Sequence, residues 1–351
     1  MAVTPDVRPT LLRWVVRPAW ALVGTLALAF AVVAVARALT AGPSPPPSST
    51  VVPPWQFLPL LASVVAFGLP HGAVDHLALP WVHDRPVTPR ALAGVGLLYL
   101  VLGGAFFAAW FLAPAASFVA FIALTWFHWG QGDLYLLRAL DPGAAPTRLQ
   151  RALVVVVRGG LPMVVPLVAF PATYRRVASL VVGLFDPGAV ARLDPLFRPE
   201  VRAALGVALL SAALASLALG RRTGGAAWRY DAVETTLLAA YFAVVPPVLA
   251  IGVYFPLWHS VRHVARMVAL DPGGRAALDA DRVGAALGAF ARDAAPLTVV
   301  ALVLLGSAAV VVPAAPAAPG ELAALYLAVL AALTLPHTVV VSLLDRQQGV
   351  W

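Results

Sequence analysis

Long apolar runs, separated by short segments that hold most of the polar residues, follow one another along the whole chain. A helix needs roughly 20 consecutive apolar residues to cross the hydrocarbon core of a bilayer. Ten segments come near that length, and each predicts a membrane-spanning helix: 18–38, 55–80, 91–113, 116–137, 152–170, 200–219, 230–246, 247–270, 295–312 and 321–344. The expected fold is therefore an all-α integral membrane protein, a polytopic bundle of about eight to ten transmembrane helices.

Prolines and segment lengths set the less obvious boundaries. Pro246 and Pro247 divide the apolar stretch 230–270 into two helices, because proline suits the start of a helix better than its interior. The run 176–185 is apolar but short, which favours a re-entrant or interfacial segment.

Three regions follow from this pattern. Residues 1–54 are predicted to hold an uncleaved N-terminal transmembrane helix and a Pro-rich linker, 41–54, that is stiff and polyproline-like. Residues 55–345 form the main transmembrane bundle, and 346–351 are a short C-terminal tail. No segment is long and polar enough to stand as a separate soluble domain.

Composition supports a lipid environment. Of the 351 residues 61% are hydrophobic and 11% charged, against roughly 25% charged in a soluble domain. The mean hydropathy of +0.87 is opposite to that of a disordered chain. The chain has no cysteine, which excludes disulfides, thiolate metal sites and cysteine nucleophiles. Any metal must therefore be held by histidine or carboxylate.

The positive charge sets an orientation. All 24 basic side chains are arginines, and most fall in the segments that would be cytoplasmic if the N-terminus is inside. Both termini are then cytoplasmic, and the protein is expected in the cytoplasmic membrane as a multi-pass protein. The arginines form no basic stripe, so no nucleic-acid partner is expected.

All histidines except His83 lie within predicted spans, although an imidazole in a bilayer is costly unless it is paired or binds a ligand. His71 lies on the second span, His128 on the fourth, His259 and His263 on the eighth, and His337 on the tenth. These four spans run in the same direction. Each histidine stands at a comparable distance before a cytoplasmic arginine, so they are expected to meet in one layer. The alternative for any single histidine is an interhelical hydrogen bond.

Spacing distinguishes the roles of these side chains. His259 and His263 are four residues apart, so they share a helix face and can bind one metal ion from adjacent turns. By the same rule Asp75 shares a face with His71 and is expected to accept its hydrogen bond, or one from another span. His76 is five residues from His71 and points elsewhere.

Two further clusters complete the set. In the segment 126–133, Trp126, Phe127 and Trp129 surround His128, and Asp133 is a weaker candidate as its hydrogen-bond acceptor. In Leu335-Pro336-His337, as in Leu69-Pro70-His71, the proline is expected to bend the helix and aim the histidine. A kink with a merely hydrogen-bonded histidine is the commoner outcome for such a tripeptide.

Several neutral imidazoles without an obligatory carboxylate suit zinc, copper or ferrous iron, and donor type alone does not choose among them. A zinc hydrolase is less natural, because the chain has no His-Glu-x-x-His motif. Glu234 is interpreted instead as a charge at a helix N-terminus. A site enclosed by tryptophans within a bilayer suits an apolar substrate and O₂.

Four motifs together resemble a known family. His71-Gly72-Ala73-Val74-Asp75-His76, Phe127-His128-Trp129-Gly130 with Asp133, Trp258-His259 with Arg262-His263, and Pro336-His337 are similar to those of the bacteriorhodopsin-related Brp/Blh membrane β-carotene 15,15′-dioxygenases. The resemblance covers about residues 55–345, which would then be the catalytic bundle. The N-terminal helix and the Pro-rich linker look like additions to the family's core.

The resemblance implies oxidative cleavage of the central double bond of β-carotene by O₂ at a non-haem Fe(2+), giving two molecules of retinal, the chromophore of microbial rhodopsins. The family's iron ligands fall on His71, His128, His259 and His263. Asp75, His76, Asp133 and His337 are then expected to surround or supplement them, and Trp126, Phe127, Trp129 and Trp258 to form the substrate wall. Arg262 is expected to pair with an aspartate or a carbonyl.

Three other functions remain open at this stage. A membrane di-iron hydroxylase or desaturase would use more histidines, in H-x-x-x-H and H-x-x-H-H boxes. A non-enzymatic haem or carotenoid carrier would show the absorption of its pigment. A transporter with a histidine proton relay would be expected to contain an internal repeat, of which only the Leu-Pro-His echo is seen.

Overall fold

A computed structural model describes residues 7–40, 52–223 and 227–351. These residues form helices and connecting turns, without a strand. The predicted linker 41–54 lies mostly outside the described residues. Within this described part of the chain, six helical segments are long and apolar enough to cross a membrane: Arg8–Thr40, Pro89–Leu112, Arg148–Ala169, Pro199–Thr223, Val283–Val311 and Pro319–Gln347. The chain is thus an all-α, multi-pass membrane protein.

Most predicted spans are continuous helical paths. The paths that meet the length and hydropathy expected of a span are α1 (Val7–Leu11) with the π-helical η1 (Leu12–Val16) and α2 (Arg17–Thr40); α6 (Pro89–Leu98) with the π-helical η3 (Tyr99–Gly103) and α7 (Gly104–Leu112); α9 (Arg148–Ala169); α11 (Pro199–Thr223); α16 (Val283–Val311); and α17 (Pro319–Gln347).

Three other predicted spans are helical but more polar. They correspond to α8 (Pro114–Leu140), to α12 (Ala227–Val244), and to the path of α13 (Pro247–Tyr254), the π-helical η5 (Phe255–Ser260) and α14 (Val261–Leu270). Their polar side chains keep them out of the apolar set, so the described residues hold six apolar spans and three more polar helical paths, against the eight to ten spans predicted. The expected division at Pro246 and Pro247 is confirmed, because α12 ends before these prolines and α13 begins at the second.

Shorter helices connect the long ones. The segment 176–185 lies mostly in α10 (Pro171–Gly183), which packs on α17 and on the 3₁₀ segment η4 (Pro187–Phe197). At the other end of the bundle, α15 (Pro272–Asp279) joins α14 to α16. Side-chain caps start two of the long helices: Thr88 accepts a bond from the Ala91 amide at α6, and Thr147 and Gln150 form a capping box at α9.

The prediction of one continuous helix over 55–80 is wrong. The chain forms instead η2 (Pro54–Phe57), α3 (Leu58–Ala62), a turn, α4 (Gly68–Gly72) and α5 (Asp75–Val82). Ser63 donates to the Leu60 carbonyl and contacts Tyr326 of α17 at 3.1 Å, and Phe67 has a φ of 66°. A Cβ at Gly68 would lie 2.2 Å from the Ser63 carbonyl oxygen, so the turn requires glycine there.

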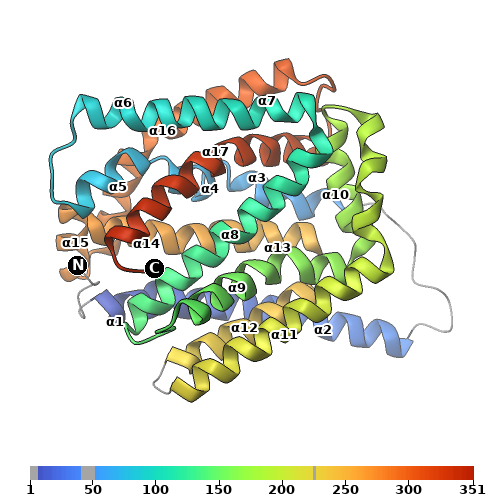
Figure 1. Cartoon of the computed structure of the whole chain (residues 1–351), viewed down its shortest axis with the longest axis horizontal. Helices are drawn as coiled ribbons and strands as arrows, with labels where there is room; N and C mark the ends of the chain where they lie inside the picture. The colour runs from blue at the N-terminus through green and yellow to red at the C-terminus, as the bar shows by residue number, and fades with distance from the viewer. Residues whose placement is uncertain (1–6, 41–51, 224–226) are drawn as a thin grey trace.

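The helices form layers around α17 and α8 (Figure 1). The α6–α7 path lies along one edge, α11, α12 and α2 lie along the opposite edge, and α13–α14 crosses the middle. The first turns of the described chain and the last turn of α17 lie at the same end, where Leu11 and Val16 pack with Leu136 and Leu140 of α8. This arrangement accords with termini on one side of a membrane.

Candidate metal centre

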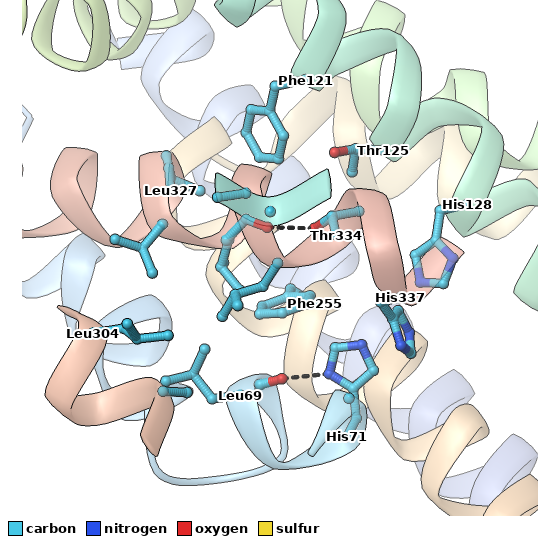
Figure 2. Close-up of a pocket in the computed structure, with 18 of the residues that line it drawn as sticks. Leu69, His71, Phe121, Thr125, His128, Phe255, Leu304, Leu327, Thr334 and His337 are labelled. Carbon is cyan, nitrogen blue, oxygen red and sulfur yellow. Dashed lines mark hydrogen bonds between the residues drawn. The ribbon is translucent and has the colours of Figure 1, made fainter. Parts of the chain in front are cut away.

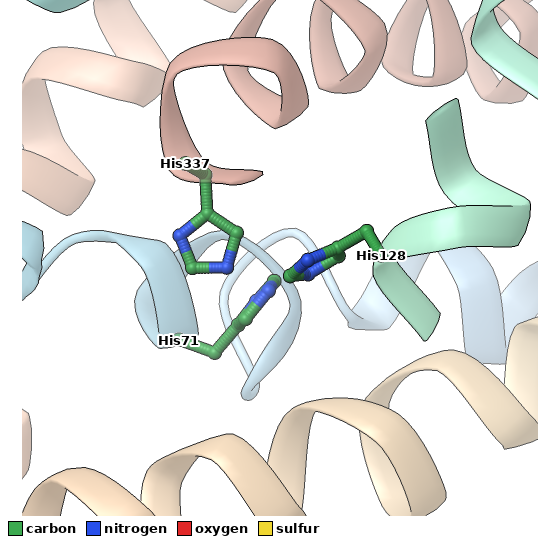
Figure 3. A group of neighbouring side chains, drawn as sticks. All are labelled: His71, His128 and His337. Atoms are coloured by element: carbon green, nitrogen blue, oxygen red, sulfur yellow. The ribbon is translucent and has the colours of Figure 1, made fainter. Parts of the chain in front are cut away.

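Five histidines from five helical elements meet inside the bundle. His71 comes from α4, His128 from α8, His259 from η5, His263 from α14 and His337 from α17, and each side chain is buried. The His337 ring centroid lies 4.7 Å from that of His128, 4.9 Å from that of His71 and 5.0 Å from that of His263. The predicted convergence of the histidines is confirmed, and Figure 3 shows three of the rings around a common space.

Groups of potential ligand atoms mark the centre of this cluster. One atom each from His71, His128 and His337 lie within 4.8 Å of one another, and so do atoms of Asp75, His263 and His337. The Nε2 atoms of His128 and His259 are 3.1 Å apart. Two nitrogens that bind one ion at about 2.1 Å and at right angles would be separated by about 3.0 Å. The His128–His259 pair therefore has a separation suited to a shared ion.

A π-helical turn presents His259. The segment Phe255–Ser260 is π-helical and contains Pro256, whose missing amide hydrogen favours such a departure from the α-helix. Single π turns of this kind occur frequently at functional sites. His263 follows on the next, α-helical turn, so the pair reaches the cluster from one continuous path.

The tautomer of His71 is set by its own helix. Its Nδ1 donates to the Gly68 carbonyl, which can only accept, and so its Nε2 keeps a lone pair (Figure 2). Ser260 lies 3.4 Å from the same Nδ1. The expected hydrogen bond between His71 and Asp75 is not formed, because the helix is interrupted at residues 73–74 and the i, i+4 relation is lost.

Asp75 bonds instead to another span, the alternative considered for it. Its carboxylate accepts from His337 Nδ1 at 2.8 Å and from the Tyr99 hydroxyl at 2.6 Å. Asp75 is buried, and both donors come from helices distant in the sequence. Sequence reasoning missed Tyr99, although a tyrosine within the apolar run 91–113 was a usable signal.

Unpartnered nitrogens in the cluster test whether a metal fits. His128 Nδ1, His263 Nε2 and His337 Nε2 are buried and have no hydrogen-bond partner among the described residues. An unsatisfied buried polar atom costs free energy, and clusters of such atoms call for an explanation. A metal ion bound to His263 and His337 through Nε2 would satisfy two of the three, so the donor set fits a metal.

Arg262 lies in a buried ion network, and its predicted pairing with an aspartate is confirmed. It donates to Asp133 at 2.8 Å and to Glu234 at 2.6 Å, and its guanidinium lies over the Trp258 ring at 3.9 Å. Arg158 of α9 also pairs with Glu234. The network joins α8, α9, α12 and α14 beside the histidines.

Two predictions about acidic residues are wrong because of this network. Asp133 does not accept from His128, since it lies five residues further along a regular helix and faces Arg262. Glu234 is not a charge at a helix start. It lies within α12, is buried, and accepts from Trp20 of α2 as well as from both arginines.

A cavity of about 910 Å³ adjoins the histidines (Figure 2). This volume is near the upper end of the usual range for ligand pockets. Apart from the histidine end the wall is almost wholly apolar, with Leu69, Phe121, Phe255, Leu304 and Leu327 among its side chains. The cavity extends from α5 and α6 past the cluster towards α10.

Only one of the four predicted wall residues reaches the cavity. Trp129 lines it and stacks on Phe255. Trp126 donates to the Val156 carbonyl on α9, and Trp258 lies in the ion network, donating to Asp133. Phe127 faces outward and stacks on Trp351, at the end of the C-terminal tail. Adjacent residues of a helix point in different directions, so one aromatic cluster in sequence forms several contacts in space.

The remaining two histidines lie apart from the five. His76 is half-buried on α5 and lines the cavity, but it belongs to neither group of potential ligands. His83 is exposed, and its Nδ1 donates to the Leu79 carbonyl at 2.9 Å.

Comparisons with known proteins find a matching family model and several relatives of this chain. A family model described as beta-carotene 15,15′-dioxygenase matches residues 62–345. The chain is 52% identical over 301 residues, 85% of this chain and 87% of the relative, to a probable beta-carotene 15,15′-dioxygenase Blh of Halobacterium salinarum strain NRC-1. It is 35% identical over 309 residues, 83% of this chain and 84% of the relative, to a probable beta-carotene 15,15′-dioxygenase Brp of Halobacterium salinarum strain R1.

A shorter match covers 109 residues, 31% of this chain and 36% of the relative, at 33% identity to a beta-carotene 15,15′-dioxygenase of an uncultured marine bacterium. No solved structure shows significant similarity to the chain.

Proposed function

Because the chain belongs to the β-carotene 15,15′-dioxygenase family, we propose that it cleaves the central 15,15′ double bond of β-carotene with O₂ and releases two molecules of all-trans-retinal. The observation that carries this proposal is a cluster of five buried imidazoles against a long apolar cavity. Adding O₂ across one carbon–carbon double bond and breaking that bond yields two aldehydes, so one β-carotene and one O₂ account for both products.

The proposed cofactor is Fe(2+), held by His71, His128, His259 and His263. Neutral imidazoles accept zinc, copper or iron, but zinc has no redox chemistry and would not serve an oxygenase. When bound, ferrous iron supplies the activation of O₂. The hydrogen bond from His71 Nδ1 to Gly68 supports this assignment, because it leaves the other ring nitrogen free to bind a metal.

The cavity wall would position the polyene and exclude water. Trp129 and Phe255 stack on one another beside His259, and Phe255 meets the His71 ring at 5.7 Å. These aromatic faces would hold a flat, rigid substrate next to the imidazoles. Holding reactants in a fixed orientation is worth several kcal/mol of activation energy, about 7–11 in the best cases.

Substrate and products would travel through the lipid. Some cavity-lining side chains are exposed, among them Leu100 of η3 and Val300 of α16. We infer that the cavity opens beside these helices towards the bilayer in which β-carotene dissolves. We place the protein in the cytoplasmic membrane, where retinal released into lipid is available to a rhodopsin.

The test is expression in cells that make β-carotene. The wild-type protein is expected to bleach the cells and to produce retinal, and His83→Ala is expected to behave alike, since that side chain is exposed and distant from the cluster. His259→Ala is expected to leave the cells coloured and the purified protein without iron.

Persistent colour in cells that contain folded, iron-bound wild-type protein would contradict the proposal. So would a haem Soret band in the purified protein, because that spectrum would favour a haem carrier.

A further inference from the structure

His337 occupies the middle of the histidine cluster. Its ring makes edge contacts with those of His71, His128 and His263, and it contributes to both groups of potential ligand atoms. A residue that merely marks a helix kink after Pro336 would not need to contact three other imidazoles. The position of the ring therefore calls for a role in the centre itself.

The two nitrogens of His337 have different surroundings. Nδ1 donates to the Asp75 carboxylate at 2.8 Å, and Nε2 is buried without a partner among the described residues. The Nδ1 bond fixes the neutral tautomer whose Nε2 carries the lone pair. A buried nitrogen lone pair within a cluster of imidazoles is suited to a metal ion.

Two neighbours hold the ring in this orientation. Tyr99 donates to the same carboxylate at 2.6 Å, so Asp75 is itself fixed from a third helix. On another side, a Cβ at Gly72 would lie 3.4 Å from His337 Nδ1, which shows how closely the α4 backbone approaches the ring. Carboxylates that accept from the far nitrogen of a histidine ligand orient the ring and raise its basicity.

We propose that His337 is a further ligand of the metal centre, positioned by Asp75 and, through Asp75, by Tyr99. The inference rests on the proposed iron centre. We assign Asp75 the role of a positioning residue, since both of its oxygens face His337 Nδ1 and one of them also accepts from Tyr99.

Iron affinity separates these roles without reference to activity. Purified full-length variants are loaded with Fe(II), and retained iron is measured against increasing concentrations of a competing chelator. Losing a residue that supports a metal ligand typically weakens metal binding by about 10–100-fold. His337→Gln removes a proposed ligand and is expected to weaken iron binding by more than about 100-fold. Asp75→Asn is expected to weaken it by about 10–100-fold, and Tyr99→Phe by less.

Two controls interpret the result. His83→Gln is expected to bind iron as the wild type does. If His259→Ala loses iron while His337→Gln and Asp75→Asn keep wild-type affinity, the inference is wrong and the iron centre stands. If His259→Ala also keeps its iron, the proposed centre itself is wrong.

Asp75→Asn decides the question if His337→Gln does not fold, because it preserves side-chain size and leaves His337 in place. Its Co(II)-loaded form adds a second readout. A visible absorption spectrum that differs from that of the Co(II)-loaded wild type supports positioning through Asp75, and an identical spectrum with unchanged affinity contradicts it.

Discussion

Buried charged residues lie beside the histidines, and each of them pairs with at least one residue of opposite charge. Arg158 and Arg262 are almost fully buried and face Asp133, Asp231 and Glu234. Charges removed from water are stable only when they are paired and hydrogen-bonded. Because Arg262 lies between His259 and His263 in sequence, the network holds the helix that supplies both imidazoles.

Loss of one carboxylate from this network should be costly. In Glu234→Gln the two arginines lose one of the two carboxylates that they share, while Asp133 still faces both, and we expect destabilisation of about 1–3 kcal/mol from the lost buried hydrogen bonds. Asp194→Asn removes the partner of Arg175 in a largely exposed pair, and we expect about 0–1 kcal/mol there. Thermal unfolding in detergent, followed by circular dichroism, compares the two. Equal losses would contradict the structural role of the network.

The histidines could be predicted from sequence, whereas their partners could not. Imidazoles within apolar spans are rare enough to indicate a common site. The partner of Asp75 depended on a helix break that separates it from His71 and on helices far along the chain. The central position of the His337 ring follows from the same tertiary contacts, which sequence spacing does not show.

At the scale of the helices, the backbones of α8 and α9 approach each other closely. A Cβ at Gly159 of α9 would lie 1.8 Å from the Trp126 carbonyl oxygen of α8, and one at Gly130 of α8 would lie 2.1 Å from the Val155 carbonyl oxygen of α9. Small residues allow helix backbones to approach in this way within membranes. The α8–α9 pair thereby fixes the position of His128.

A single methyl group should disturb this pair. Gly159→Ala is expected to destabilise the protein by about 1–3 kcal/mol or more, as overpacking does, because a backbone atom must move. Gly288→Ala on α16 is the control, since a Cβ there meets no atom within 4 Å. The comparison is made on apparent melting temperature and folded yield. A Gly159→Ala protein as stable as the control would disprove the close packing.

Hydropathy predicted the long helices because a span needs only a sustained apolar run. It did not predict the interruption of 55–80, where Ser63 and Tyr326 meet across 263 residues of sequence. Irregular backbone at membrane depth is tolerated where the protein itself buries it. A one-dimensional average over an apolar run does not detect such a turn.

At the scale of the whole molecule, the lining of the cavity comes from the α6–α7 edge and from the middle of the bundle. Side chains of α6, η3, α7 and α16 form part of its wall, together with His71, His128, His259 and His337. The proposed function requires this space for a long polyene. The cavity is therefore a feature that mutations can block without touching the metal centre.

Two glycines on α6 provide such a test. Gly96 lines the cavity and Gly94 does not, and a Cβ at either meets no atom within 4 Å. Gly96→Phe is expected to fill part of the cavity and lower retinal formation by about tenfold or more, with iron content unchanged, because misplacing a substrate by about 1 Å can cost 100-fold in rate. Gly94→Phe is expected to act like the wild type. Equal activity of the two variants would argue against this cavity as the substrate site.

The amount of retinal formed per β-carotene consumed tests the central claim most directly. With purified, iron-loaded protein under air, two molecules of retinal are expected for each β-carotene that disappears, and none from the His259→Ala protein. Consumption that gives aldehydes of unequal length, or no consumption by wild-type protein with iron bound, would contradict central cleavage at the histidine cluster.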